Sequence, residues 1–525
     1  MKYIAGQDRN QIPLFASSIE DAIEQDNEIR LIDLFVDSLD LKNFGFNVRH
    51  MENGRPAYHP ADLLKLYIYG YLNKIRSSRD LEKECRRNIE AMWLLKGLVP
   101  DHNTISNFRR DNPKAIKKVF RATVTIAKNF DLIGGKLLAG DSTKLRAQNS
   151  KKNNFNQAKV ERHLQYIENK LNQFMEELES NDGNIEKQQV LQAEIEKQQQ
   201  RRNKYKAIEK QLNDTGEVQV STSDPESRQL ITRNNITEVA YSVQTVVDAE
   251  HCLPIDYKVT NQNDSKAMGN MARRAKSILR TSDFTLLYDK GYHTGSELKI
   301  ALDLGIETVV AIPDIPSSSH APNPDYNVSE FNYNPLADCY TCPQGHILSS
   351  NGNWYRKDRR KDTIKVQHYK TPACKKCPVL LQCTKNTRGR GRVIERSEHA
   401  PYYEANRRNV ELKEHVYKRR QAIVEHPYGI IKRQWGFYYI TTKKGINRAS
   451  ADVGLMFLAF NLRRLINIIG FDKLKTGLKT LFFDLFNAFA GDFCLILALD
   501  RPQQLKNVRC FDDGCSPLYR IFGYR

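Results

Sequence analysis

The sequence lacks both a membrane segment and an export signal. Its longest apolar stretches lie near the C-terminus, and charges interrupt them: Arg463 and Arg464 follow one, and Asp484 and Asp492 lie within the next. The N-terminal residues MKYIAGQDRNQIPLF contain no apolar core of a signal peptide. We therefore expect a cytoplasmic protein with no membrane partner.

Acidic residues are also scarce relative to basic ones. The 525 residues include 62 Asp and Glu against 81 Lys and Arg, which gives a formal net charge of +19. This surplus favours a polyanionic partner or an acidic substrate. A hydrophobic content of 40% excludes a disordered chain, and the length suggests roughly three or four domains. Without export, the ten cysteines are expected to be reduced thiols or metal ligands rather than disulfides.

Residues 1–130 are predicted to form a helical DNA-binding domain. LIDLFVDSLDL and ADLLKLYIYGYLNKI repeat apolar residues at helical spacing. The segment DHNTISNFRR is typical of the second helix of a helix-turn-helix. Its polar face carries residue types suited to phosphates or base edges: Asn103, Ser106, Asn107, Arg109 and Arg110. An ordinary helical bundle with a basic surface is the alternative.

Strands alternating with helices predict an α/β core with a mixed sheet, so the fold class is mixed α+β. Three segments are assigned to this core: 131–153, 215–330 and, as its final helices, 401–470. KLLAGDSTKLRA is predicted to be a short strand that ends at Asp141, and FTLLYDKGY a strand with Asp289 at its end. Residues 241–260 are expected to form a β-hairpin. The tail 471–525 supports no structural prediction.

Two insertions interrupt this core. Residues 154–214 are predicted to form an antiparallel helical hairpin, with arms of about 40 Å at ~1.5 Å per residue. Its first arm has a heptad seam: Val160, Leu164, Ile167, Leu171, Phe174 and Leu178. A spacer, a dimerisation arm and a DNA clamp all remain open as roles. Residues 331–400 form a second, cysteine-rich insertion resembling a zinc ribbon.

Three carboxylates are candidates for one catalytic centre. Asp141 and Asp289 are each expected at a strand end, and Glu425 on a helix that Pro427 interrupts. If they converge, they offer oxygen ligands to two divalent cations, Mg²⁺ or Mn²⁺, which suit in-line phosphoryl displacement. An Asp at a strand end, taken alone, is more often a helix or turn cap than a metal ligand.

Basic residues surround Glu425 and favour a role for it as a metal ligand beside a phosphate. Arg419 and Arg420 precede it, and Lys432 and Arg433 follow at one to two helical turns. Cations on the helix of a metal-binding carboxylate suit phosphate positioning. We therefore predict DNA contacts for Arg420, Lys432 and Arg433.

GDSTKLRAQNS at Asp141, LYDKGYHTGSEL at Asp289 and VEHPYGIIKRQWG at Glu425 resemble the signatures of bacterial insertion-sequence transposases of the DDE superfamily. PAYHPADLLKLYIYGYLNKIRSSRDLEKECRRN and PDHNTISNFRR resemble the N-terminal domain of the same transposases. The resemblance covers roughly residues 1–470. It implies an RNase H-like core with Asp141, Asp289 and Glu425 as the catalytic, metal-binding triad.

Related transposases carry a Tyr-x2-Arg-x3-Glu-x6-Lys signature around the Glu. Glu425 and Lys432 fit its last part, and the resemblance implies that Lys432 contacts a DNA phosphate. Tyr417 and Arg420 fit Tyr-x2-Arg, but four residues separate Arg420 from Glu425. The roles of Tyr417 and Arg420 therefore do not transfer directly.

The resemblance further implies hydrolysis at transposon ends and transfer of the 3′-hydroxyl to target DNA. The expected partner is double-stranded DNA, bound by a homodimer because two ends are cut in concert, in the bacterial nucleoid. The alternative is a catalytically silent DNA-binding regulator derived from a transposase. A resolvase-like nuclease is disfavoured by the long helical N-terminal region and the cysteine-rich insertion.

Five cysteines fall within 45 residues and predict a structural zinc site. Two Cys-x2-Cys pairs, at Cys339 and Cys342 and at Cys374 and Cys377, precede Cys383. Five thiols compete for four positions, and His346 is a further candidate; reduced thiols without metal are the alternative. The resemblance favours Cys342, Cys374, Cys377 and Cys383, with Cys339 as the competing ligand. Four thiolates would leave no open position for water.

Overall fold

The structure is a computed structural model of the chain. It describes residues 18–48, 56–180, 185–233, 236–314, 319–358, 363–386, 391–442 and 444–480.

The N-terminal part is helical, as predicted. Its helices are α1 (Ile29–Asp37), α2 (Leu41–Phe44), α3 (Pro60–Leu72), α4 (Ser78–Arg87), α5 (Ile89–Leu94), α6 (His102–Asp111) and α7 (Pro113–Asn129). Side chains cap α4 and α6: Ser77 accepts from the N–H of Asp80, and Asp101 from those of Asn103 and Thr104. The carboxylate of Asp101 also complements the positive end of α6.

A six-stranded mixed sheet forms the centre of the molecule. Its strands are β1 (Leu137–Arg146), β4 (Arg228–Arg233), β5 (Ile236–Asp248), β6 (Pro254–Thr260), β7 (Thr285–Tyr288) and β8 (Glu307–Val310). The strand order is β4-β5-β1-β7-β8. β6 also pairs with β5, along the part of β5 that follows its pairing with β4. β1, β4 and β6 are antiparallel to β5, while β1, β7 and β8 are mutually parallel. This mixed sheet is consistent with the RNase H-like core that the resemblance implies.

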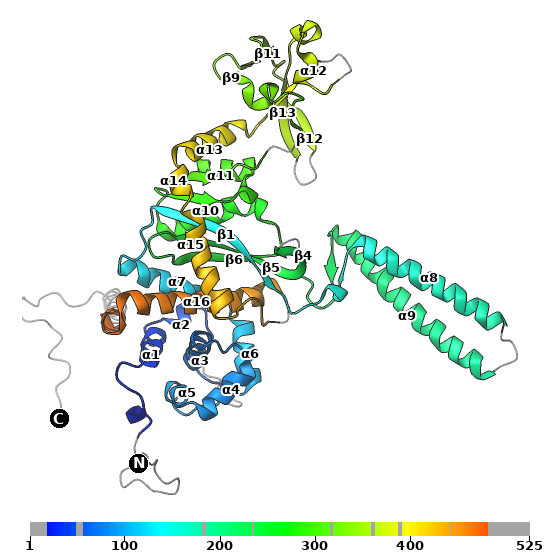
Figure 1. The fold of residues 1–525 in the computed structure, drawn as a ribbon. Helices are drawn as coiled ribbons and strands as arrows, with labels where there is room; N and C mark the ends of the chain where they lie inside the picture. Colours follow the sequence, from blue (N-terminus) through cyan, green and yellow to red (C-terminus); the bar gives the residue numbers. More distant parts are fainter. Residues whose placement is uncertain are drawn as a thin grey trace, which may run out of the picture.

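Helices cover both faces of the sheet (Figure 1). They are α10 (Met268–Leu279), α11 (Gly295–Asp303), α13 (Ala400–Leu412), α14 (Glu414–Tyr417), α15 (Arg420–Tyr428) and α16 (Ile446–Ile469). Ala139 and Leu287 pack against Ile423 and Val424 of α15 on one face. The alternate residues, among them Leu138, belong to the main core on the other face, which includes α7, α10 and α16.

One local prediction about the core is wrong. Asp141 does not end its strand: β1 continues to Arg146, because residues 138–146 all pair with β5. The final helices of the core begin with α13, α14, α15 and a π-helical turn, Gly429–Gln434. Pro427 lies inside α15 and has no N–H to donate to the preceding turn, which accounts for the change of helical type after it.

The helical hairpin projects away from the core (Figure 1). It consists of α8 (Gln157–Ser180) and α9 (Ile185–Thr215), and the short strands β2 (Asn154–Phe155) and β3 (Val220–Ser221) pair at its base. Val160, Ile208 and Leu212 are buried in a small separate core at that base. Residues 181–184, between α8 and α9, lie outside the described residues.

The cysteine-rich region forms two small antiparallel sheets beyond α13, at the end of the molecule opposite the N-terminal helices (Figure 1). They contain β9 (Asn332–Asn334), β10 (Cys339–Thr341) and β11 (Ile347–Ser349), and β12 (Tyr355–Asp358), β13 (Thr363–Tyr369) and β14 (Ile394–Ser397), with helix α12 (Leu380–Cys383) beside them. Tyr340, Leu348 and Tyr369 are among the residues of its own core. No single helix in the described part of the chain is long and apolar enough to span a membrane; only α16 with 471–480 passes as a pair, bent by 112°.

Candidate active site and nucleic-acid interface

Two of the three predicted carboxylates lie side by side. Ala139 of β1 is paired with Leu287 of the parallel neighbour β7. Asp141 and Asp289 each follow two residues later, so both point to the face that α15 covers. Asp289 lies directly after β7, as predicted, and its carboxylate accepts from the N–H of Gly291 at 2.9 Å.

The electrostatics of this pair favour a bound cation. Burial raises the pKa of Asp141 to about 6, and the charge of Asp289 acts in the same direction. The Arg420 guanidinium and the N–H of Ser142, 2.7 Å from the carboxylate, oppose this rise. Two neighbouring carboxylates in a desolvated site are the donor set that a hard divalent cation requires. Asp141 and Asp289 therefore fit the predicted metal ligands.

Arg420 lies at these carboxylates rather than on an open surface. Its Nη1 is 3.4 Å from Oδ2 of Asp141, with 15% and 24% of the two side chains exposed. Burial alone would lower the pKa of Arg420, but Asp141, Tyr417 and Asp289 raise it. The Arg420 guanidinium therefore offsets the charge of the acidic pair in this structure, and its contact with DNA stays a prediction.

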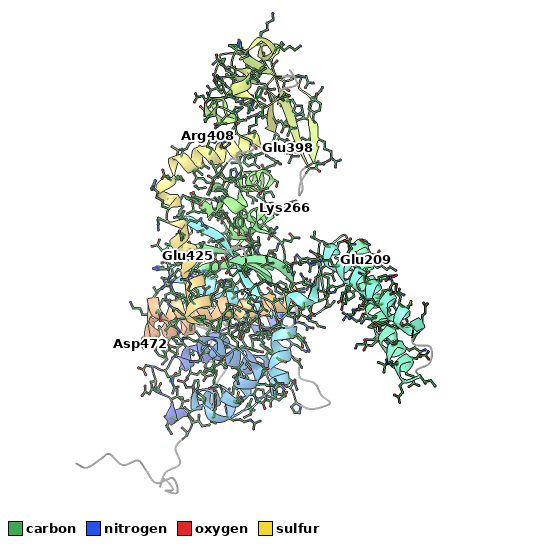
Figure 2. The ribbon with its side chains drawn as sticks, turned by 45° about the vertical axis from the view of Figure 1, so that its right-hand side comes forward. Glu209, Lys266, Glu398, Arg408, Glu425 and Asp472 are labelled. Atoms are coloured by element: carbon green, nitrogen blue, oxygen red, sulfur yellow. The ribbon has the colours of Figure 1, made fainter. Side chains whose placement is uncertain are left out.

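Glu425 does not join the pair in this structure. It is exposed on α15 beside the central sheet (Figure 2), and its carboxylate accepts from Nε2 of Gln421 at 3.0 Å. α15 buries Ile423 and Val424 against the sheet, which places the next residue about 100° further round the helix. Within the described residues, no three His, Cys, Asp or Glu side chains are arranged to hold a metal ion. The predicted convergence of three carboxylates is thus seen for two of them.

Two further side chains connect the π-helical region to β1. The hydroxyl of Tyr428 is hydrogen-bonded to Thr245 and lies 3.2 Å from the carbonyl oxygen of Asp141. Lys432, a predicted DNA contact, donates to Oγ1 of Thr143 at 3.0 Å and to the carbonyl of Lys144 at 3.2 Å. Arg433 is exposed. Sequence reasoning missed Tyr428, although its position three residues after Glu425 on one helix was a usable signal.

The predicted DNA face of α6 is only partly a surface. Asn103, Asn107 and Arg110 are exposed and Ser106 is half-buried. Arg109 is only 6% exposed: its Nη1 donates to the hydroxyl of Tyr71 at 2.9 Å and lies 3.6 Å from Asp452 of α16. The prediction that Arg109 lies on the exposed polar face of α6 is therefore wrong, because α6 packs this residue against α16.

Four of the five clustered cysteines lie near enough to influence one another electrostatically. Burial raises the pKa of Cys383, and the neighbouring Cys374, Cys342 and Cys377 act in the same direction. Cys339 is buried in β10. The amide of Gly345 donates to the carbonyl of Cys342 at 2.8 Å and closes a tight turn there. The thiols do not reach metal-binding geometry in this structure, but four gathered thiols are the donor set of structural zinc.

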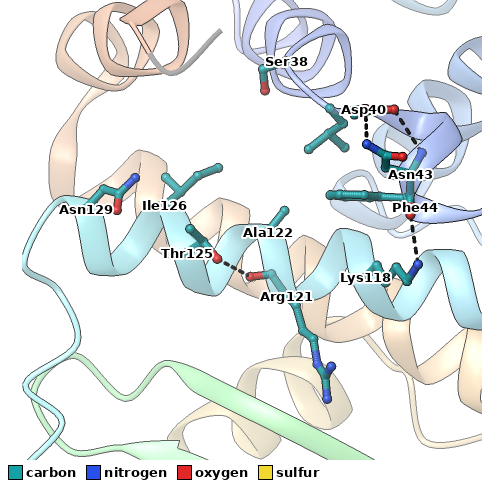
Figure 3. Close-up of a pocket in the computed structure, with 11 residues that line it drawn as sticks. Ser38, Asp40, Asn43, Phe44, Lys118, Arg121, Ala122, Thr125, Ile126 and Asn129 are labelled. Carbon is teal, nitrogen blue, oxygen red and sulfur yellow. Dashed lines mark hydrogen bonds between the residues drawn. The ribbon is translucent and has the colours of Figure 1, made fainter. Parts of the chain in front are cut away.

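A cavity of about 530 Å³ lies away from the acidic pair. It opens between α2 and α7, and Phe44, Ala122 and Ile126 line it together with the stem of Lys118 (Figure 3). None of the predicted site residues lines this cavity.

Two protein-family models match the chain. The model described as transposase domain (DUF772) matches residues 17–111, and the one described as transposase DDE domain matches residues 341–466, which include Glu425. A solved structure, the cryo-EM structure of the piggyBac transposase synaptic complex with hairpin DNA, aligns over 91% of this chain and 83% of its own. Its sequence identity is 9% and its TM-score 0.28, so nothing is argued from it. No curated protein matches the chain.

Proposed function

The chain is a DDE transposase with an N-terminal DUF772 domain, and from this premise we propose a specific activity. It binds the ends of an insertion sequence, cleaves DNA there by metal-assisted hydrolysis and joins the 3′-hydroxyl to target DNA. The observation that carries this proposal is the carboxylate pair of Asp141 and Asp289 on neighbouring parallel strands, one of them with a pKa raised to about 6.

Asp141, Asp289 and Glu425 are the residues that would hold the divalent cations, two of Mg²⁺ or Mn²⁺. When bound, such cations supply Lewis acidity to the scissile phosphate and to the attacking oxygen. Asp141 and Asp289 provide oxygens at fixed positions on the sheet, and Glu425, which lies within the residues matched by the DDE domain, is proposed as the third ligand.

The chain's cations then have distinct tasks. Arg420 balances the charge of Asp141 and Asp289 in the absence of metal. Divalent cations bound to the two carboxylates would take over this task and leave Arg420 available to a DNA phosphate. Lys432 is held against β1 two residues past Asp141, which suits contact with the phosphate next to the cut. Arg433 is exposed for the DNA backbone. None of these steps requires a covalent protein–DNA intermediate.

Binding of double-stranded DNA is proposed for the exposed polar residues of α6, Asn103, Ser106, Asn107 and Arg110, together with the overall charge of +19. A homodimer would bring two ends together for concerted cutting. A catalytically silent regulator remains the second candidate function, and the same experiment separates the two.

The cysteine-rich region is proposed to bind one structural zinc ion through Cys342, Cys374, Cys377 and Cys383. The closeness of these four thiols supports this set over one that includes Cys339. A zinc ion held by four thiolates has no open coordination position, so zinc would stabilise this region and take no part in the chemistry.

The test is cleavage of duplex DNA that carries the sequences flanking the gene, with and without Mg²⁺. Asp289→Asn should abolish cleavage and leave DNA affinity within about twofold of wild type, because it removes a metal ligand and no DNA contact. The matched control is Asp283→Asn, an exposed carboxylate six residues earlier that pairs with Lys136. Wild-type protein that binds these duplexes without cutting them in Mg²⁺ or Mn²⁺ would favour the regulator.

A further inference from the structure

A polar groove lies where the N-terminal helices meet the core. Its volume is about 500 Å³, and it is bounded by the start of α4, by α6 and by the segment that leads into α16. Figure 1 shows α4 and α6 beside α16. Arg79, Arg110 and Arg448 line it, and none of the described residues that line it is acidic.

The floor of this groove carries excess positive charge. Arg76 and Arg109 both line it and are only 5% and 6% exposed. One carboxylate serves both: Asp452 lies 2.8 Å from Arg76 and 3.6 Å from Arg109. Two buried guanidinium groups against one carboxylate leave one positive charge without a counter-charge in this network, where little water screens it.

Several buried donors in the floor have no hydrogen-bond partner among the residues that the structure describes. They are Nε and Nη1 of Arg76, Nε of Arg109, and the hydroxyls of Thr441 and Thr442, and all four residues line the groove. Buried polar groups are normally paired, so donors that are left open and share one groove indicate a missing acceptor. An acceptor with several oxygens and a negative charge would satisfy both the hydrogen bonds and the excess charge.

We propose that this groove binds the phosphate backbone of duplex DNA and so ties the N-terminal domain to the catalytic core on the same DNA. The proposal rests on the proposed function. Ser106 and Asn107, which belong to the predicted DNA face of α6, line the same groove. The exposed arginines Arg79 and Arg448 line it from different elements, α4 and α16, so a DNA backbone in the groove would meet cations from both.

Duplex DNA fits better than a small anion. The cavity is larger than one phosphate ion, and its cations come from three separate elements rather than from one binding loop. Arg110 is paired only with its neighbour Asp111 at the surface, a bond of the exposed kind that a phosphate can replace.

The first test measures the affinity of the full-length protein for fluorescent duplexes as a function of salt. Each phosphate contact contributes about 0.9 to the salt slope, which is about eightfold in affinity near 0.1 M salt. Arg79→Ala with Arg448→Ala should therefore lower the slope by about 2 and weaken binding by more than tenfold, on flanking and unrelated duplexes alike. The matched control is Arg273→Ala, an exposed arginine of α10 outside the groove. A double variant that binds like the control overturns the proposal.

The second test uses the open hydroxyl of Thr442. Thr442→Val removes a buried hydroxyl without a partner, so the free protein should unfold at the same or a higher temperature while DNA binding weakens several-fold. Unchanged DNA affinity of Thr442→Val overturns the proposal. It is also overturned if 50 mM inorganic phosphate, in place of DNA, raises the unfolding temperature of the wild type as DNA does. The cleavage rate at saturating DNA separates the groove proposal from the proposed function. If the groove only binds DNA, the double arginine variant cleaves saturating DNA at the wild-type rate. Wild-type protein that binds DNA but never cuts it contradicts only the catalytic proposal.

Discussion

Replacement of Asp452 by Asn should destabilise the protein strongly. Asp452 is completely buried on α16, where it accepts from Arg76 at 2.8 Å, from the hydroxyl of Tyr71 and from the N–H of Thr441 at 2.6 Å. Burial acts to raise the pKa of Asp452, and the Arg76 and Arg109 guanidinium groups overcome this and hold it below its usual value. The carboxylate therefore remains charged in the folded protein.

The size of the effect follows from what the change leaves behind. Asn keeps the shape but removes the carboxylate that both buried guanidinium groups share, and loss of one partner of a buried ion pair costs about 3–5 kcal/mol. The carboxylate contribution is present above the ordinary pKa of about 3.8 and is lost as the pH falls through the lower folded pKa. Wild type should therefore lose stability on its acid limb, and Asp452→Asn should lose less there.

Urea unfolding of both proteins at pH 7 and at pH 3, below the ordinary pKa of 3.8, followed by tryptophan fluorescence, measures this. The control is Asp472→Asn, an exposed carboxylate on the helix after α16. If the midpoint of Asp452→Asn at pH 7 matches that of Asp472→Asn, the argument from unbalanced buried charge is refuted.

Two further changes probe the acidic pair and the cysteine cluster. Asp141→Asn should stabilise the metal-free protein above pH 6 by up to about 3 kcal/mol. The pKa of Asp141 is about 6 in the folded protein and 3.8 ordinarily, so its ionisation opposes folding as the pH rises. Thermal unfolding at pH 5 and pH 8 in EDTA checks this, and equal shifts of the unfolding temperature at both pH values would contradict it. Gly391 has φ +73°, and a Cβ there would lie 2.5 Å from Cβ of Cys374, so Gly391→Ala should reduce the zinc content from about one ion per chain. Mass spectrometry of protein purified without chelator measures the zinc content. Gly352→Ala is the control, because Gly352 has a similar φ and open space around it.

Local pattern determined much of this protein. Alternating and apolar runs predict the 241–260 hairpin and the strand before Asp289, and helical spacing predicts α16; each of these elements is present in the structure. These predictions succeed because periodicity and turn residues act over a few positions along the chain. The matched families agree with the resemblance that the motifs around Glu425 and the N-terminal helices carry.

Long-range contacts decided the rest. Arg109 is buried because Asp452, 343 positions later, supplies its counter-charge, and no local pattern in α6 distinguishes it from the exposed Arg110. Asp141 lies within β1 because β5, almost a hundred residues away across the helical hairpin, extends the pairing to Arg146. The side of α15 that faces the sheet, and with it the separation of Glu425 from Asp141, depends on how Ile423 and Val424 pack. Packing and charge balance between distant segments are set only when the chain is folded, because burial gives a charge its partner and a strand its neighbour.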